Sequence, residues 1–383
     1  MLSQVVDSTR VRVAGAWVAS RAALVLAVLV VARLAGVAPV AHPLASGTTW
    51  LDRFGYGDTY HYVRIAEVGY LPPGLPCCDQ AFFPGYPALM ALLAPVFGGS
   101  VTAAGWAVTL VAGVVGALGV WTLVADDPRG GRRAGQRAVL LLAVAPCGYF
   151  LVAVYTEALF LAVAVWAWVW ATHRNWWVAG SLAALGTAVR VNGLFLVAGL
   201  AVMYVVQLRH DGRLRRPRVD VLALGLPLLP VAGFVAYLHH RTGSWNAWRE
   251  AEATGWSRET HWPWVGLRSA WDAVWATGDW VLAASRMGDV VAVLFGVAVV
   301  ALLAWQRRWP EATYLGLSVG VVLCSTLWVS SPRYALTWFP AYLALATVSG
   351  ERRARLLTRA LVLVALPLLA LATWASATRH WVA

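Results

Sequence analysis

The sequence predicts an all-α polytopic membrane protein, and three observations lead to that prediction. The chain of 383 residues is 60% hydrophobic and only 13% charged, and its mean hydropathy is +0.66. The apolar fraction of a soluble domain is nearer to about half. The apolar residues are also gathered into runs that short arginine-bearing links separate. We therefore expect residues 1–383 to form one integral membrane domain.

Apolar runs that can cross about 30 Å of hydrocarbon, with allowance for short broken helices, give about eleven expected spans. The first run follows Arg10, Arg12 and Arg21 as a signal peptide would. Because it extends beyond the apolar region of a signal peptide, we expect it to be a retained span. The expected spans are residues 22–40, 101–125, 138–150, 153–172, 176–189, 193–208, 219–239, 290–306, 312–329, 335–348 and 361–378.

The arginines divide the links between these spans into two sets. Arginine-bearing links fall at every second position along the chain, so the positive-inside rule predicts that they and the amino terminus are cytoplasmic. The net charge of +12 would suggest a nucleic-acid partner in a soluble protein. Here the arginines are better explained as topology signals that contact membrane lipids, and we expect no nucleic acid. These links are residues 10–12, 126–137, 173–175, 209–218, 307–308 and 351–359.

The other links hold the polar residues that topology does not explain, and we expect them on the extracytoplasmic face of the plasma membrane. Two of them are large loops, within residues 41–100 and 240–289, and the smaller ones are residues 148–157, 190–193 and 330–334.

The first outer loop carries the candidate catalytic group, Asp58, in the segment G-D-T-Y-H-Y. A carboxylate at the mouth of a helical bundle can remove a proton from a hydroxyl group. Asp58 would also suit the N-cap of the helix that follows it. The neighbouring His61 and the aromatic residues favour the catalytic role, with Asp52 as the alternative base.

The segment after Asp58, V-R-I-A-E-V-G-Y, predicts a short amphipathic helix at the membrane surface. Its apolar face would carry Ile65 and Val68, and its polar face Arg64 and Glu67.

Arginines on the outer face need a separate explanation, because topology favours positive charge inside. Arg190 lies between two short apolar runs, and Arg333 follows a proline at the end of a span. Charges at membrane depth face the bundle interior and pair there. A guanidinium group binds a phosphate through two parallel hydrogen bonds. A structural ion pair with Glu157 is the alternative, and both arrangements can occur in different states.

The second outer loop is rich in tryptophan and charge. Its segment W-N-A-W-R-E-A-E-A predicts a helix in the membrane interface. Most of the tryptophans from Trp245 to Trp271 are expected to form an aromatic belt at the headgroup level. One or two, Trp256 among them, are expected to stack against a sugar ring or to line a polyprenyl chain.

The cysteines do not suggest a zinc site, because no Cys/His spacing matches one. Cys147 and Cys324 lie in apolar runs and are expected to be small core residues. Cys77 and Cys78 are adjacent in the first outer loop, where a vicinal disulfide and two free thiols are both open alternatives.

A base and two phosphate-binding arginines on one face of a lipid-accessible bundle suggest a reaction on a lipid phosphate. Sugar transfer from a polyprenyl-phosphate sugar fits, because the leaving phosphate needs no protonation. A single displacement would invert the anomeric centre, and fixed cations would stabilise the charge that develops on the phosphate. No cofactor and no metal are needed for this chemistry.

Five motifs that follow one another along the outer face resemble the PIG-V-like family of membrane mannosyltransferases and its bacterial members, within the GT-C superfamily. The family patterns are W-D-x-x-H/W-Y/F…I-A-x-x-G-Y, F-F-P-x-Y-P, Y-T/S-E-S/A-L-F, R-x-N-G and S-x-P-R-Y. The similar segments here are residues 57–70, 82–87, 155–160, 190–193 and 330–334.

The resemblance implies a GT-C-like bundle and an inverting mannosyltransferase, a hexosyltransferase that uses dolichyl- or polyprenyl-phosphate-mannose and a lipid-linked or cell-envelope glycan acceptor. It implies Asp58 as the base and requires no nucleotide sugar or metal. Gly57 replaces the family's tryptophan, so Asp52, in W-L-D, stays the alternative base. The expected substrate-binding residues are His61, Tyr62, Arg64, Tyr86, Tyr155, Glu157, Arg190, Asn192, Trp256, Arg333 and Tyr334.

A transporter or flippase of a lipid-linked or anionic substrate is the rival function, with Arg190, Glu157 and Arg333 on its path. Transporters commonly have paired halves and polar sites at the midplane. In this sequence the halves are dissimilar and the polar groups gather at one surface. A structural subunit without catalysis would leave the outer carboxylates unexplained.

Overall fold

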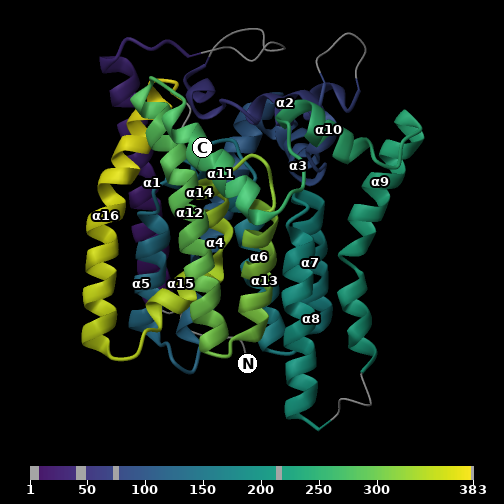
Figure 1. Cartoon of the computed structure of the whole chain (residues 1–383), viewed down its shortest axis with the longest axis vertical. Coiled ribbons are helices and arrows are strands. Elements are labelled where there is room, and N and C mark those ends of the chain that lie inside the picture. Colours follow the sequence, from purple (N-terminus) through teal and green to yellow (C-terminus); the bar gives the residue numbers. More distant parts are fainter. Residues whose placement is uncertain (1–7, 40–48, 72–76, 213–217, 381–383) are drawn as a thin grey trace.

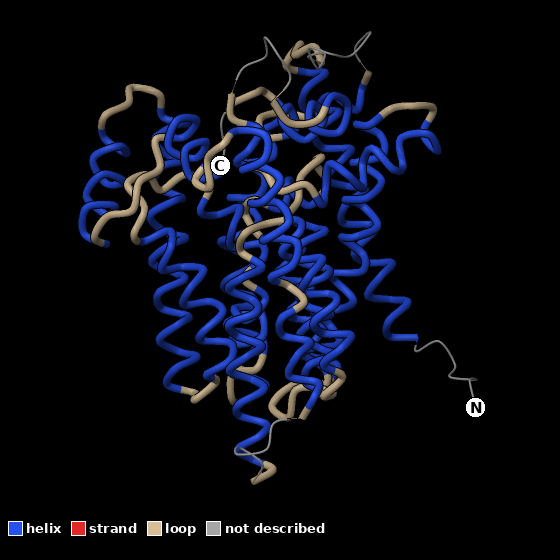
Figure 2. The backbone as a smooth tube through the Cα atoms, turned by 90° about the vertical axis from the view of Figure 1, so that its right-hand side faces the viewer, coloured by secondary structure: helices blue, strands red, loops and turns tan. Residues whose placement is uncertain are grey.

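The computed structural model describes residues 8–39, 49–71, 77–212 and 218–380, and within these ranges it contains helices and no named strand. Figure 2 shows the helices as a bundle with loops gathered at its two ends. The predicted all-helical class is therefore confirmed. Residues 41–48 and 72–76 of the first predicted outer loop, and 213–217 of the predicted link 209–218, lie outside the described residues.

Six helical segments in the described ranges are long and apolar enough to cross a membrane, judged by length and composition. Together they support a membrane-embedded protein. They are α1 (Ser8–Leu34), α4 (Val101–Ala125), α8 (Gly193–His210), the segment Val219–Thr242 that ends with α9 (Leu228–Thr242), α12 (Trp280–Trp305) and α16 (Glu351–Ala377).

Shorter helices lie among the long ones (Figure 1). Neighbouring helices cover much of their surface. Each of them can therefore be shorter than a helix that crosses the whole membrane in contact with lipid. The predicted total of about eleven spans remains a prediction. These helices are α5 (Arg132–Ala143), α6 (Glu157–Thr172), α7 (Trp176–Val189), α13 (Trp309–Leu323) and α15 (Phe339–Ala346).

Several predicted spans begin earlier than expected, and α1 and α12 are two of them. Helix α1 starts at Ser8 rather than at residue 22, and it carries Arg21 in its interior. The Arg21 side chain is buried and donates to the carbonyl oxygen of Gly148 at 3.2 Å, which compensates for its charge inside the bundle. Helix α12 starts at Trp280 rather than at residue 290, so it takes up the end of the predicted second outer loop.

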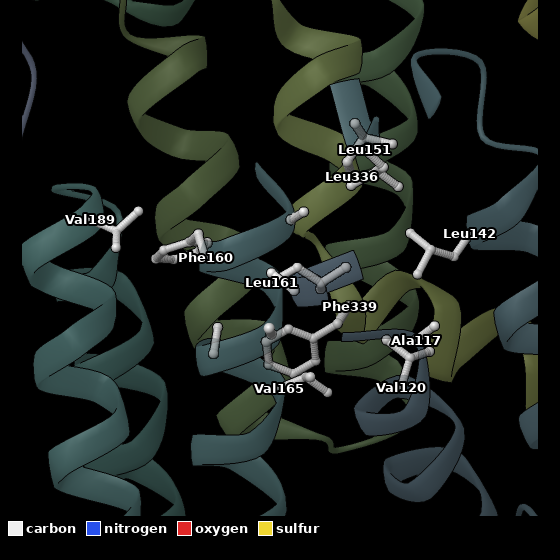
Figure 3. Packing of buried hydrophobic residues seen from close by; sticks show 14 of the residues in the cluster. Ala117, Val120, Leu142, Leu151, Phe160, Leu161, Val165, Val189, Leu336 and Phe339 are labelled. Atoms are coloured by element: carbon white, nitrogen blue, oxygen red, sulfur yellow. The ribbon is translucent and has the colours of Figure 1, made fainter. Parts of the chain in front are cut away.

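The core lies where α4 and α6 pack against each other, with α5 and α15 beside them. Figure 3 shows Val120, Phe160, Val165 and Phe339 among the buried side chains there. A Cβ atom on Gly119 would lie 2.4 Å from Val165 Cγ1. This glycine therefore permits the close approach of the two helices, as small residues do between membrane helices.

The arginine-bearing links meet one another at one end of the bundle. Each of three ion pairs joins two links that are far apart in the sequence. This clustering is what the sorting of links predicted, whereas the cytoplasmic side of this end stays a prediction. The pairs are Arg308 Nη1 with Asp127 Oδ2 at 2.8 Å, Arg137 Nη1 with Glu351 Oε2 at 3.0 Å, and Arg174 Nη2 with Asp211 Oδ1 at 3.0 Å.

The loops that the sequence predicts to face outward fold at the opposite end, where Figure 1 shows α2, α3 and α10 grouped together. The predicted helix in the second outer loop is α10 (Ala247–Trp256), and a further helix, α11 (Pro263–Trp275), was not predicted. The first outer loop forms α2 (Thr59–Val68) and α3 (Gly85–Leu93).

We predict that Arg308→Gln lowers the free energy of unfolding by about 1–3 kcal/mol, because it leaves the partly buried Asp127 without its charged partner. Thermal unfolding in detergent measures the change. Arg307→Gln, at the neighbouring exposed arginine, is the control. A loss that is equal in the two variants would show that the Arg308–Asp127 pair does not hold the links together.

Candidate active site

The turn before α2 presents Asp58. Gly57 has a φ of +69°, in the left-handed region that glycine adopts without penalty. A tryptophan here would be strained, which gives a backbone reason for the departure from the PIG-V-like pattern. The turn is anchored by Tyr155, whose hydroxyl accepts from the Asp58 amide at 3.2 Å and donates to the carbonyl oxygen of Tyr56.

An ion pair joins Asp58 to Arg333 across the fold. Asp58 Oδ2 accepts from Arg333 Nη1 at 2.7 Å, although the two residues are 275 positions apart in the sequence. The two side chains are only 13% and 7% exposed. Asp58 occupies the N-cap position of α2, yet its side chain makes no capping hydrogen bond. The position of the Asp58 carboxylate is therefore explained by its pairing with Arg333 and not by helix capping.

The pKa of Asp58 lies below its ordinary value. Burial raises this pKa, but the charge of Arg333 and its hydrogen bond lower it by more, and His61 and Arg190 lower it further. The carboxylate is therefore ionised at neutral pH, which is the state that a proton acceptor requires.

Glu157, the first residue of α6, connects both outer arginines. Its Oε1 accepts from Arg190 Nη1 at 2.5 Å and lies 3.3 Å from Arg333 Nε. Arg190 also donates to Thr156 Oγ1 at 3.0 Å. The structural ion pair that the sequence offered as an alternative is thus present. Asp58 and Glu157 together balance the charges of the two arginines.

Aromatic rings enclose the Arg333 guanidinium group. Its Cζ lies 5.2 to 5.6 Å from the ring centroids of Tyr155, Phe150 and Tyr334. Arg190 lies 5.4 Å from the Tyr334 ring. Stacking on aromatic faces holds the two arginines in place while keeping them partly desolvated, which strengthens their interaction with an anion.

The turn that carries Arg333 is α14 (Ser331–Tyr334), and a buried carboxylate anchors it. The Ser331 amide donates to Asp289 Oδ1 at 2.7 Å. Asp289 lies in α12 and is 2% exposed. This positioning role was not predicted, because Asp289 was placed at the end of the second outer loop.

A second charged cluster surrounds Asp79. Its carboxylate accepts from Arg64 Nε at 2.6 Å, and His61 Nδ1 lies 2.7 Å from it. Arg64 is fully buried and Val68 is 48% exposed. The predicted faces of α2 are therefore wrong at these two positions, because Asp79 draws the arginine inward.

Trp256, at the end of α10, covers His61. The two ring centroids are 5.6 Å apart, and the Trp256 ring lies 5.3 Å from that of Phe82. Trp248 also turns inward and donates from Nε1 to the carbonyl oxygen of Ala81 at 3.1 Å. The other tryptophans from 245 to 271 are exposed, as an aromatic belt would be: Trp245, Trp262, Trp264 and Trp271.

The remaining predicted binding residues lie around this centre with different partners. The Tyr62 ring packs against Tyr155 at 6.2 Å. The Tyr86 hydroxyl bonds the carbonyl oxygen of Gly105 at 2.9 Å, so this buried residue anchors α3 to α4. Asn192 is half-buried at the N-cap position of α8. Binding roles for these three residues stay predictions.

Asp52, the alternative base, belongs to a local turn. Its carboxylate accepts from the amide and the hydroxyl of Thr49, the latter at 3.2 Å. Asp58, in contrast, is paired with a distant arginine at the centre of the cluster. The geometry therefore favours Asp58 over Asp52.

Glu252 and Arg258 also lie beside this charged cluster, and neither was predicted as a site residue. Arg258 Nη2 donates to the Tyr334 hydroxyl at 2.8 Å, and its Nη1 lies 3.3 Å from Glu252 Oε2. Both residues belong to the charged part of the second outer loop. The sequence offers several acids there and no signal for which of them turns inward.

Cys77 and Cys78 are joined by a disulfide bond. Cys78 is buried beneath α10, where a Cβ atom on Gly255 would lie 3.1 Å from Cys78 Cβ. Cys147 is a buried free thiol, as predicted, and Cys324 is partly buried. Within the described ranges no group of three or more His, Cys, Asp and Glu side chains could hold a metal ion. The expected independence from metal stays a prediction.

Residues 79–237 match the model of a protein family described as dolichyl-phosphate-mannose-protein mannosyltransferase. The matched stretch contains Asp79, Glu157 and Arg190, and it excludes Asp58 and Arg333. It covers less than half of the chain. The match supports a membrane glycosyltransferase of the GT-C superfamily, and the PIG-V-like assignment stays a prediction. No curated protein matches the chain.

Solved structures of an oligosaccharyltransferase from Archaeoglobus fulgidus are similar to the chain. The form in complex with zinc and sulfate has 17% identity and a TM-score of 0.45, and the match covers 93% of this chain and 53% of that chain. The form with an inhibitory peptide and a dolichol-phosphate has 15% identity and a TM-score of 0.45, over 94% and 56% of the two chains. The chain thus spans about half the length of these proteins.

We predict that the thermal stability lost in Asp58→Asn depends on pH. Because the folded-state pKa of Asp58 is lowered, its ionised form stabilises the fold above the ordinary pKa of about 4, and this contribution is lost as the pH falls through the folded value. The difference in Tm between the wild type and the variant should therefore be largest near neutral pH and should shrink below about pH 4. A difference that stays constant with pH would contradict the pairing.

Proposed function

We propose that the protein is an inverting glycosyltransferase, which transfers mannose from a polyprenyl-phosphate-mannose donor to a lipid-linked or cell-envelope glycan on the extracytoplasmic face of the plasma membrane. The observation that carries this proposal is the direct contact between Asp58 and Arg333, 2.7 Å apart. This contact places the candidate base and the arginine that would bind the phosphate closer together than the length of one sugar residue.

In the proposed reaction Asp58 takes the proton from an acceptor hydroxyl. The hydroxyl oxygen attacks the anomeric carbon, the bond from that carbon to the phosphate oxygen breaks, and its electron pair stays on the phosphate. The products are a glycoside of inverted configuration and a polyprenyl phosphate with one more negative charge. Arg333 and Arg190 stabilise that charge where it develops.

The donor phosphate would compete with the carboxylates for the arginines. When Arg333 turns toward the phosphate, Asp58 loses the charge and the hydrogen bond that lower its pKa most. The pKa of Asp58 then rises, and the carboxylate becomes a stronger base. Proton removal is thereby coupled to the presence of the donor.

Two further observations support the proposal. The matched family acts, by its description, with dolichyl-phosphate-mannose, a polyprenyl-type donor. The charged cluster also lies beneath the outer loops at one end of the bundle, where Trp256 and Tyr334 provide ring surfaces for a sugar. A transporter would place such groups near the midplane of a path through the protein.

We predict that Asp58→Asn lowers the rate of mannose transfer by about 10²–10⁴-fold, the usual contribution of a general base. Donor binding should be retained or tighter in this variant, because Arg333 no longer pairs with a carboxylate at position 58. Transfer from radiolabelled polyprenyl-phosphate-mannose and a separate donor-binding assay measure the two effects. Asp52→Asn, in the same loop, is the control. Full activity in Asp58→Asn would exclude Asp58 as the base.

We predict that Arg333→Ala and Arg190→Ala each weaken donor binding by about 1.5–3 kcal/mol, the free energy of a lost charged hydrogen bond. Arg249→Ala, at an exposed arginine of α10, should leave donor affinity unchanged. The measurement is the Kd for polyprenyl-phosphate-mannose in nanodiscs. Unchanged affinity in both cluster variants would mean that neither arginine binds the phosphate.

A further inference from the structure

Helix α10 packs against the first outer loop and against His61 of α2. Trp248 and Gly255 fix it to the first outer loop, through the carbonyl oxygen of Ala81 and through Cys78. Figure 1 shows α10 next to α2 at the outer end of the bundle. One face of this helix must therefore look toward the charged cluster.

Glu252 and Trp256 lie on that face. They are four positions apart, so their side chains are neighbours on one side of the helix. Because Trp256 faces His61 and Phe82, Glu252 also points toward α2. The Glu252 side chain is 20% exposed. Glu250, on another face, is exposed and accepts from the hydroxyl of Ser244 at 2.8 Å.

Arg258 holds Glu252 in position through one carboxylate oxygen. Its Nη1 lies 3.3 Å from Oε2, and its Nη2 donates to the Tyr334 hydroxyl at 2.8 Å. Among the described residues no hydrogen bond reaches Oε1 of Glu252. The pair thus has balanced charge and keeps one acceptor oxygen for a ligand.

A chain of contacts links Glu252 to the catalytic candidate. Arg258, the partner of Glu252, donates to the Tyr334 hydroxyl, and the Tyr334 ring lies 5.6 Å from the guanidinium carbon of Arg333, which pairs with Asp58. Burial raises the pKa of Glu252, Arg258 opposes this, and the charge of Asp58 raises it further. The two carboxylates therefore lie within electrostatic reach of each other.

We propose that Glu252 and Trp256 form a subsite for a neutral hexose, the sugar that presents the acceptor hydroxyl to Asp58. A carboxylate oxygen accepts hydrogen bonds from adjacent sugar hydroxyls, and an indole ring packs against the apolar face of a pyranose. The unbonded carboxylate oxygen of Glu252 suits hydroxyl groups and would repel a phosphate, for which Arg190 and Arg333 are better placed. This subsite rests on the proposed function.

The test uses methyl mannobioside, a water-soluble hexoside, and saturation-transfer NMR with the full chain in detergent. Wild-type protein should bind it, and Glu252→Gln should weaken the binding about tenfold or more, as loss of a hydrogen bond to a charged group does. Trp256→Ala should weaken it also. Glu250→Gln removes the charge of another acid of α10 and is the matched control, so this variant should bind the mannobioside as the wild type does. The affinity for the donor should be unchanged in Glu252→Gln.

Failure of the subsite and failure of the proposed function give different results. If wild-type protein binds polyprenyl-phosphate-mannose but not the mannobioside, or if Glu252→Gln and wild type bind the mannobioside equally, the subsite is overturned and the proposed function is not. Loss of donor affinity in Glu252→Gln would assign the residue to the donor instead and would also overturn the acceptor subsite. Absence of donor binding and of transfer in the wild type would overturn the proposed function.

Discussion

The ion pair between Asp58 and Arg333 is the contact on which the organisation of the outer end depends. It joins the first outer loop to a turn 275 residues later in the chain. Removing two charges from water is costly, and a buried pair often stabilises a protein no better than apolar residues would. Buried charge pairs with perturbed pKa values often mark functional sites. We propose that the pair is part of a site that acts on an anion.

The surroundings of this pair make it tolerable. Glu157 and Arg190 extend it into a charge-balanced cluster, and the rings of Phe150 and Tyr155 exclude water from the Arg333 guanidinium group. A balanced cluster does not attract a phosphate as free arginines would. In the proposed mechanism the phosphate and the carboxylates exchange partners, so that binding of the donor would change the basicity of Asp58 directly.

Much of this arrangement could be predicted from the sequence. Hydropathy gave the bounds of α4 and α7 as residues 101–125 and 176–189, and the arginines sorted the links onto two ends that the structure keeps apart. The same sorting brought Asp58, Glu157 and Arg333 to one end, because residues in links on one face must converge when the helices pack.

What the sequence could not predict depends on partners that only the fold brings together. Arg64 belongs to the polar face of α2 by periodicity, but Asp79 draws it inside. Glu252 is one of several acids in its loop, and its orientation follows from the packing of Trp256 on His61. The apolar run 335–348 was predicted as one span, but its helix α15 has only 8 residues. The length of an apolar run therefore does not give the length of its helix, which is why the number of spans is harder to predict than their order.

The most direct test of the central claim, that this cluster is the active site of a sugar transferase, is to incubate membranes containing the protein with radiolabelled polyprenyl-phosphate-mannose. The products are then analysed for label and for anomeric configuration. The account predicts that label moves to a lipid-linked or glycan fraction in the configuration opposite to that of the donor. Transfer with retained configuration, or label that stays in the donor fraction, would contradict it.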